Sequence, residues 1–198
     1  LNEPLKSGGR IVISTPFHLK FPRGIYSRLG HIGESYQVTQ WYPKPAVYDK
    51  NGWHQMPYLD QGEFYSEYGT YDVFITLPKN YMVGATGDLI GGDDERNWLE
   101  IRVAETKEYL KNVDTKSRKT PDVDIDDLTF PPSASDNKTL HFRQSNVHDF
   151  GWFADKRWHV LKGEVELPHT KRKVATWVMF TEEEAHLWKD AIEYMNDA

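Results

Sequence analysis

Short stretches rich in β-branched and aromatic residues, separated by glycine and proline, run through most of this sequence. In residues 71–77 every second side chain is apolar and faces the same way: Tyr71, Val73, Ile75 and Leu77. Further β-forming segments are residues 9–19, 35–42, 81–85, 139–144, 149–154, 158–167 and 174–180. Pro16 and Pro22 limit the first of these to an edge strand or to short strands. Short strands bounded by Gly/Pro turns predict a mainly β fold, an antiparallel β-sandwich of two packed sheets.

Two segments change to the spacing of a helix. The first, residues 95–111, carries an apolar stripe made of Trp98, Ile101, Val103, Ala104 and Leu110. The second begins with a capping box, Thr181 to Glu184, and its stripe continues with Ala185, Trp188, Ala191, Ile192 and Met195. The polar residues 112–136 predict a loop. We therefore expect one helix inserted between strands and one C-terminal helix.

Composition excludes several classes of protein. The chain has no cysteine, which rules out a disulfide scaffold, a thiolate metal site and a cysteine nucleophile. Its net charge of -6, with both signs mixed along the chain, argues against a nucleic-acid partner. No apolar run approaches the ~20 residues of a membrane span, and no signal peptide is recognisable. Because the chain opens at Leu1, we expect it to be a piece of a longer protein.

The histidines offer no metal motif. Eight are present, and none forms H-x-H or H-E-x-x-H. Glu182 and His186 lie one helical turn apart, but acidic residues in a first turn are explained by the helix dipole. His148 and Asp149 could form an oriented base, although neighbours in a strand face opposite sides. The residues alone predict a β-rich domain without a catalytic centre or a metal site of its own.

Aromatic residues are densest between positions 41 and 71. The cluster consists of Trp41, Tyr42, Tyr48, Trp53, Tyr58, Phe64, Tyr65, Tyr68 and Tyr71. Such a cluster is either core and packed loop, or a platform on which sugar rings stack. We favour the core interpretation and keep the platform as the alternative.

Several blocks together resemble a known family. They are Gln40-Trp-Tyr-Pro-Lys-Pro-Ala-Val-Tyr-Asp49, residues 61–78, Tyr81-Met-Val-Gly-Ala-Thr-Gly87 and Asn146-Val-His-Asp-Phe-Gly-Trp152. With residues 181–198 as a linker helix, the chain resembles the amino-terminal domain of bacterial zinc metallopeptidases of the aminopeptidase N type, the gluzincins. The resemblance covers residues 17–198.

The resemblance implies an organisation as well as a function. Residues 1–180 would form a saddle-like antiparallel β domain, and residues 181–198 the first helix of a catalytic domain that lies outside this chain. That missing domain would carry H-E-x-x-H and hold zinc, with the motif glutamate as general base. The fragment would have no cofactor and no activity of its own. Its partners would be the catalytic domain and a peptide substrate, in an enzyme that similar bacterial members export, for example to the periplasm.

The resemblance also implies a substrate-binding residue. The family's β domain contributes one glutamate or glutamine to the free amino terminus of the substrate, nine residues before the proline of an F-P-C-x-D-E-P-like turn. In this chain the turn begins Tyr42-Pro43-Lys44 and lacks the cysteine and the Asp-Glu-Pro. Counting back from Pro43 reaches Glu34, and Gln37 is the second candidate. An ordinary exposed loop acid is the competing interpretation of Glu34.

A second hypothesis comes from a different class of protein. The chain could be a free-standing β-sandwich that binds carbohydrate or peptide through its aromatic cluster. The parent reading frame separates the two: H-E-x-x-H downstream of Ala198 supports the peptidase, and a stop codon there supports the binding module.

Overall fold

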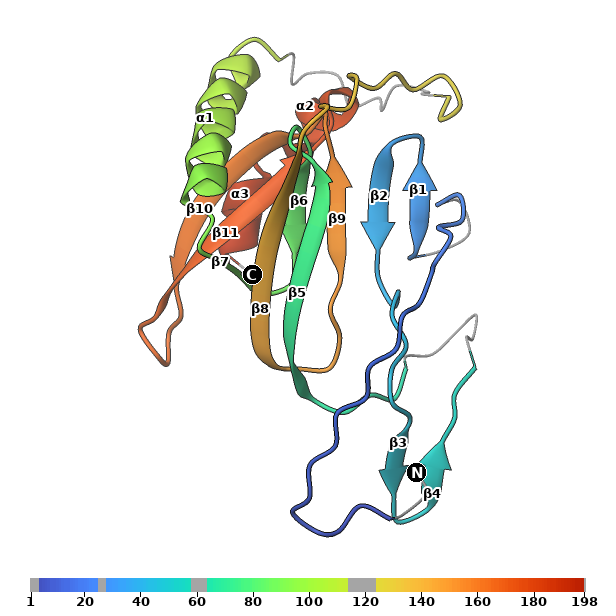
Figure 1. Cartoon of the computed structure of the whole chain (residues 1–198). Coiled ribbons are helices and arrows are strands. Elements are labelled where there is room, and N and C mark those ends of the chain that lie inside the picture. The colour runs from blue at the N-terminus through green and yellow to red at the C-terminus, as the bar shows by residue number, and fades with distance from the viewer. Residues whose placement is uncertain (1–3, 25–27, 58–63, 114–123, 198) are drawn as a thin grey trace.

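The computed structural model describes residues 4–24, 28–57, 64–113 and 124–197, and these form a mainly β protein (Figure 1). Its strands are β1 (Gly30–Ile32), β2 (Ser35–Val38), β3 (Val47–Asp49), β4 (Gly52–His54), β5 (Gly69–Pro78), β6 (Met82–Ala85), β7 (Asp88–Ile90), β8 (Asn137–Val147), β9 (Trp152–Asp155), β10 (His159–Glu166) and β11 (Lys173–Phe180). Its helices are α1 (Asp93–Leu110), the 3-10 turn η1 (Glu182–Glu184), α2 (Ala185–Trp188) and α3 (Ala191–Asp197). The expected mainly β class, with one inserted helix and helical structure at the C-terminal end, is confirmed.

The strands within the described ranges pair as antiparallel sheets. One has the order β1-β2-β9-β6, a second has the order β5-β8-β7, and β3-β4 and β10-β11 are two-stranded. Opposite Ile75 lies Leu140, and opposite Val73 lies Phe142, which gathers their side chains on one face of β5 and β8. The neighbouring Phe74 is 65% exposed. The alternation predicted for residues 71–77 is therefore confirmed.

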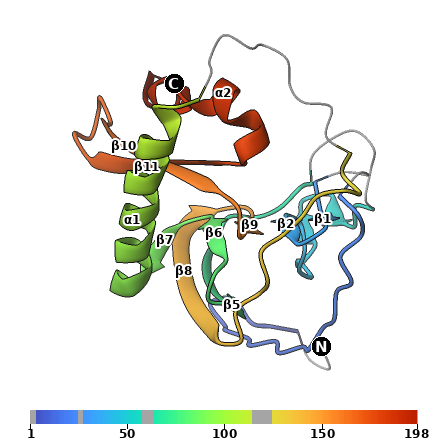
Figure 2. The same cartoon turned by 90° about the horizontal axis from the view of Figure 1, so that it is seen from above.

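Three clusters of buried residues hold these elements together. The first joins the two larger sheets through Ile75, Tyr81, Val83, Leu140, Phe142, Phe150 and Ala154. The second packs α1 onto β6 and β10 through Met82, Leu99, Val103 and Val160. The third joins the β10–β11 hairpin to the C-terminal helices through Leu161, Val178, Phe180 and Ala185. The hairpin consequently lies between α1 and α3, as can be followed in Figure 2.

Helix α1 forms where expected but buries only part of the expected stripe. Its buried residues are Glu95, Leu99, Val103 and Thr106, whereas Ile101 is 57% exposed and Ala104 is also exposed. The partner strand selects this face, because the backbone N–H of Val160 on β10 donates a hydrogen bond of 2.8 Å to the Thr106 hydroxyl. The predicted stripe is confirmed at Val103, which is buried, and at Trp98 and Leu110, which pack against core clusters, but it is wrong at Ile101 and Ala104. Contacts with β10, rather than apolar spacing alone, set the helix rotation.

The C-terminal segment is not one capped helix. Thr181 does occupy an N-cap position, but its side chain makes no capping hydrogen bond, and the helix is divided into η1, α2 and α3. Ala185 is 1% exposed, and the Thr176 hydroxyl of β11 donates to the Asn196 carbonyl of α3 at 2.6 Å. Packing against the β10–β11 hairpin therefore divides this segment, although the local pattern predicts one continuous helix. The domain boundary at Phe180 stays a prediction.

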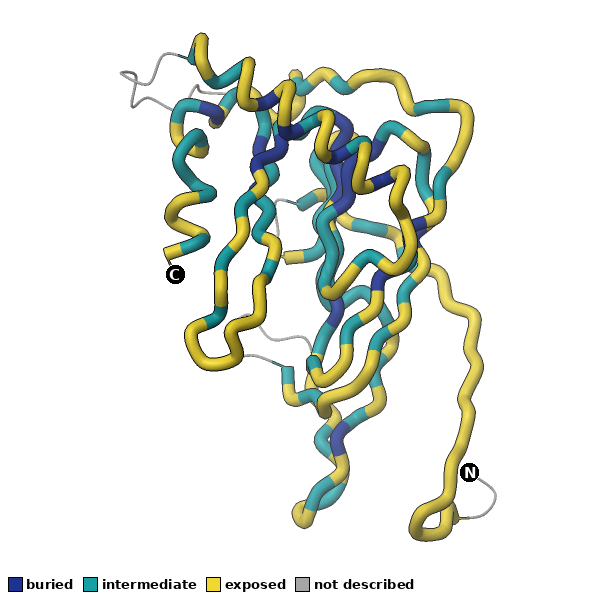
Figure 3. Tube along the Cα trace, turned by 90° about the vertical axis from the view of Figure 1, so that its left-hand side faces the viewer, coloured by how far each residue is buried: buried dark blue, intermediate teal, exposed yellow. Residues whose placement is uncertain are grey.

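The N-terminal segment also differs from expectation. Residues 9–19 form no strand and run along the molecule as an exposed segment, yellow in Figure 3. Val12 is 87% and Ile13 78% exposed. The two prolines at positions 16 and 22 cannot donate to a ladder. The predicted edge strand or short strands in this segment were therefore wrong.

Candidate functional site

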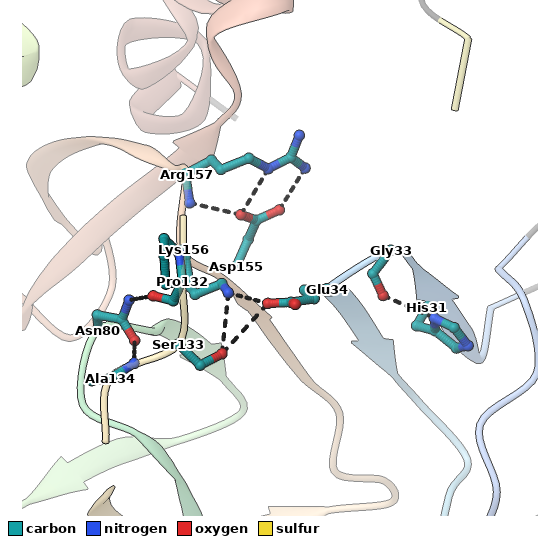
Figure 4. A network of polar contacts seen from close by, with 10 residues as sticks. All are labelled: His31, Gly33, Glu34, Asn80, Pro132, Ser133, Ala134, Asp155, Lys156 and Arg157. Atoms are coloured by element: carbon teal, nitrogen blue, oxygen red, sulfur yellow. Dashed lines mark hydrogen bonds and ion pairs between the residues drawn. The ribbon is translucent and has the colours of Figure 1, made fainter. Parts of the chain in front are cut away.

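Glu34 lies in the tight turn between β1 and β2. Gly33 precedes it with φ +55°, a conformation that glycine adopts at little cost. A Cβ atom on Gly33 would also meet the Phe130 ring at 2.3 Å. Backbone conformation and the close approach of Phe130 both require glycine at this position. Figure 4 shows Glu34 next to Gly33 in this turn, with its side chain directed toward Lys156.

The carboxylate of Glu34 meets a buried lysine. Lys156 follows β9, its side chain is 0% exposed, and its ammonium group forms an ion pair with Glu34 Oε2. The same ammonium donates to Ser133 Oγ at 3.1 Å and lies 5.2 Å from the centre of the Tyr81 ring. A buried ammonium needs such partners, because removing a charge from water without them is costly. Glu34 supplies the compensating charge.

Glu34 itself remains accessible. Its side chain is 48% exposed, and both Lys156 and Ser133 contact the same oxygen, Oε2. The hydrogen bond from Lys156 holds the pKa of Glu34 below its usual range, so that the group is a carboxylate at neutral pH. Burial and the nearby charges raise the pKa of Tyr81 to about 12, so the phenol is neutral. The site therefore presents an ionised carboxylate with room for a further donor.

A segment of the long connection covers one side of the site. Asn80 accepts a hydrogen bond from the Ala134 backbone N–H and donates to the Pro132 carbonyl, both at 2.9 Å. These two bonds place Ser133 beside the Lys156 ammonium group (Figure 4). Ser133 and Lys156 were missed by sequence reasoning, since 23 positions separate them and no spacing pattern connects them.

A second ion pair anchors the chain after β9. Asp155 is fully buried and accepts hydrogen bonds from the Arg157 backbone at 2.7 Å and from its guanidinium at 2.8 and 3.2 Å. The guanidinium lies 4.1 Å from the Phe130 ring centre. Asp155 and Arg157 thus connect the end of β9 to Phe130, the residue that packs against Gly33.

Gln37 occupies a different place. It lies on β2, opposite Gly30 of β1 and Phe153 of β9. Together with Phe153 it lines a hollow of about 180 Å³ that also includes Trp158. Glu34 and Gln37 are therefore both near β1 and β2, but the contact of Glu34 with Lys156 distinguishes it from the second candidate.

The remaining sequence candidates have other partners. The His148 ring lies 5.7 Å from that of Tyr68, whereas Asp149 pairs with Lys44 at 2.9 Å and accepts a hydrogen bond from Tyr42. Within the described ranges no group of three or more His, Cys, Asp or Glu side chains could hold a metal ion, so we derive no step through a metal for this chain. Among the same residues, no helix is long and apolar enough to cross a membrane.

The aromatic cluster divides into two groups. Trp41, Tyr42 and Tyr71 pack against the first core cluster, and the indole of Trp41 donates to the Phe150 carbonyl at 3.0 Å. An exposed group consists of Tyr48, Trp53, Tyr65 and Tyr68. Phe64 is half-buried, and Tyr58 lies outside the described residues. The core interpretation is therefore confirmed for the first group and wrong for the second.

Comparison with known proteins found no matching family model, no matching curated protein and no matching solved structure. The likeness to the gluzincins consequently depends on the sequence motifs alone.

Proposed function

We propose that this chain is the amino-terminal β domain of a zinc-dependent aminopeptidase-like metallopeptidase, in which Glu34 binds the amino terminus of a peptide substrate. The observation that carries the proposal is the state of the Glu34 carboxylate. It is ionised, about half exposed, and contacted by Lys156 and Ser133 through Oε2. The motifs around residues 40–49 and 146–152 support the assignment to this family.

An α-ammonium group fits this carboxylate chemically. A charge-assisted hydrogen bond from an ammonium to a carboxylate is about twice as strong as a neutral one. Lys156 has two opposing effects on this bond. Its positive charge weakens the attraction of Glu34 for a second cation, but its contact with Oε2 fixes the side-chain rotamer. The net result is an anchor that binds modestly and orients well.

The chain's contribution to the reaction would be positioning. Holding the amino terminus at a fixed point places the first peptide bond at a fixed distance from the anchor, which is how an aminopeptidase selects the terminal residue. Zinc and its general base would be supplied by the catalytic domain of the parent protein. We propose that this parent is exported in bacteria, as are similar members of the family.

The parent reading frame tests the assignment. H-E-x-x-H downstream of residue 198, followed by a more distant glutamate, is the expected result. A parent protein without this motif would contradict the peptidase assignment.

A specific observation favours the alternative function, a carbohydrate- or peptide-binding module. Tyr48 and Trp53 face each other across the β3–β4 hairpin, with ring centres 5.0 Å apart, and are 65% and 67% exposed. Exposed aromatic rings of this kind can stack on sugars. Titration of the protein with oligosaccharides, compared with a Trp53→Ala variant, tests this function. Saturable binding that the variant loses would support it, and the absence of binding would exclude it.

A further inference from the structure

A cleft of about 770 Å³ lies between α1, the β6–β7 region and one face of the β10–β11 hairpin. Its volume is typical of small-molecule sites, which measure about 300–1,000 Å³. The cleft is separate from the Glu34 turn, since none of Glu34, Ser133 and Lys156 lines it. An inference about it therefore does not depend on the proposed function.

The walls of the cleft are largely apolar. Trp177 and Met179 project from alternate positions of β11, and Phe153 of β9 and Leu89 of β7 also line it. Phe153 is 42% exposed. Aromatic and thioether side chains provide a flat, adaptable surface for an apolar ring or chain.

Basic side chains outnumber acidic ones around these walls. Four basic residues line the cleft, namely Arg96, Lys162, Arg172 and Lys173, against the two acids Asp88 and Glu95. This excess of positive charge contrasts with the net charge of -6 of the whole chain. Three of the four already have acidic partners, since Arg96 pairs with Asp93 at 2.7 Å and Lys162 and Lys173 pair with glutamates. The cation that favours an anionic group is therefore Arg172.

The acid at the α1 side of the cleft is already neutralised. Lys138 donates to both carboxylate oxygens of Glu95, at 2.7 and 2.8 Å, and both side chains are nearly buried. Burial raises the pKa of Glu95 and lowers that of Lys138, which indicates a poorly solvated environment. Electrostatic interactions in such an environment are stronger than in water.

The basic residues that line the cleft differ in whether their side chains already form ion pairs. Lys162 pairs with Glu100 and lies 5.1 Å from the Trp177 ring centre, and Lys173 pairs with Glu164 at 2.8 Å. Arg172 makes no side-chain ion pair with any described residue. Its guanidinium offers a planar donor set that suits a carboxylate.

We propose that this cleft binds an amphipathic carboxylate, with its apolar part against Trp177 and Met179 and its anionic group at Arg172. The apolar part gains from burial, and the carboxylate gains a charge-assisted contact at the cleft mouth.

Sodium octanoate is a suitable probe, with octanol and octylammonium as neutral and cationic analogues. Binding is measured by calorimetry and by the tryptophan fluorescence of the whole chain, because Trp158 and Trp177 both line the cleft. We expect one octanoate per chain, weaker binding of octanol, and the weakest binding of octylammonium. Failure of octanoate to saturate a single site, or equal affinity for octylammonium, would overturn the proposal.

Two variants locate the site. Arg172→Gln should weaken octanoate binding about tenfold or more and leave octanol unaffected. Ala175→Phe, on the exposed face of β11 that lines the cleft, should abolish binding of both. The matched controls are Lys107→Gln on α1 and Ser145→Phe on β8, which are exposed and outside the cleft. If Arg172→Gln binds octanoate like the unaltered protein, or if the controls lose as much affinity as the variants, the proposal is wrong.

Discussion

The ammonium group of Lys156 is buried, and its compensating carboxylate belongs to Glu34, 122 positions earlier in the chain. The pair joins the β1–β2 turn to the end of β9 and is asymmetric in exposure, since Glu34 is half exposed. Removing the two partners should therefore have unequal effects.

Glu34→Ala should destabilise the protein more than Lys156→Met does. The first leaves a buried charge without a partner, and the second replaces that charge with an apolar chain of similar length. We expect Glu34→Ala to cost about 2–3 kcal/mol, less than the ~3–5 kcal/mol of wholly buried pairs because water reaches Glu34. Urea unfolding of both variants measures this. The double variant should recover part of the loss, and a double variant as unstable as Glu34→Ala would contradict the explanation.

His159 should make stability sensitive to mild acid. Its ring stacks on Tyr109, with centres 4.2 Å apart, and burial together with the charge of Arg102 lowers its pKa. The unfolded chain therefore binds the proton more readily, so stability is complete above about pH 6.5 and declines as the pH falls below that value. Thermal unfolding between pH 5 and 8 should show this decline, and His159→Phe should reduce it. The exposed His169 provides the control, as His169→Gln should leave the profile unchanged.

Zinc should not bind to this chain stoichiometrically. The sequence lacks H-E-x-x-H and cysteine, and the described residues bring together no group of metal ligands. Calorimetric titration with zinc, and assays with aminoacyl chromogenic substrates, should give neither a specific site nor hydrolysis. One chelator-reversible zinc ion per chain would contradict this.

Residues 1–180 should fold without the C-terminal helices but with lower stability. Removal of residues 181–198 uncovers Leu161 and Val178, which α2 and α3 help to bury. We expect a cooperative thermal transition at a reduced midpoint. Loss of the transition would mean that the helices belong to the β domain, and that the boundary at Phe180 is wrong.

The local sequence pattern predicted where strands and helices form better than it predicted which of their faces are buried. Alternation identifies β5 because one face of it is buried, and helical spacing identifies α1. The buried face of α1 depends on contacts such as that between Thr106 and Val160, which are 54 positions apart. Likewise, the helical segment after Thr181 is divided by its packing on β10 and β11, which local propensity does not contain.

The partners of Glu34 in the candidate site could not be predicted from the local sequence either. The family resemblance led to Glu34, but nothing near Glu34 in the sequence indicates Lys156 or Ser133. A lysine directly after a strand is usually exposed. Only the fold of β9 against β2, together with the segment held by Asn80, makes Lys156 a buried partner.

The most direct test of the central claim is the specificity constant, kcat/KM, of Glu34 variants in the full-length parent protein. Peptides with free and with acetylated amino termini are compared, at a temperature where every variant is folded. Losing one charge-assisted hydrogen bond costs ~1.5–3 kcal/mol, so Glu34→Ala should lower kcat/KM for free peptides by about one to two decades and leave acetylated peptides nearly unaffected. Glu34→Gln should be milder, since its amide oxygen still accepts, and Gln37→Ala serves as the comparison for the second candidate. Equal effects of Glu34→Ala on both kinds of peptide, or no effect on either, would contradict the role of Glu34 as the anchor of the amino terminus.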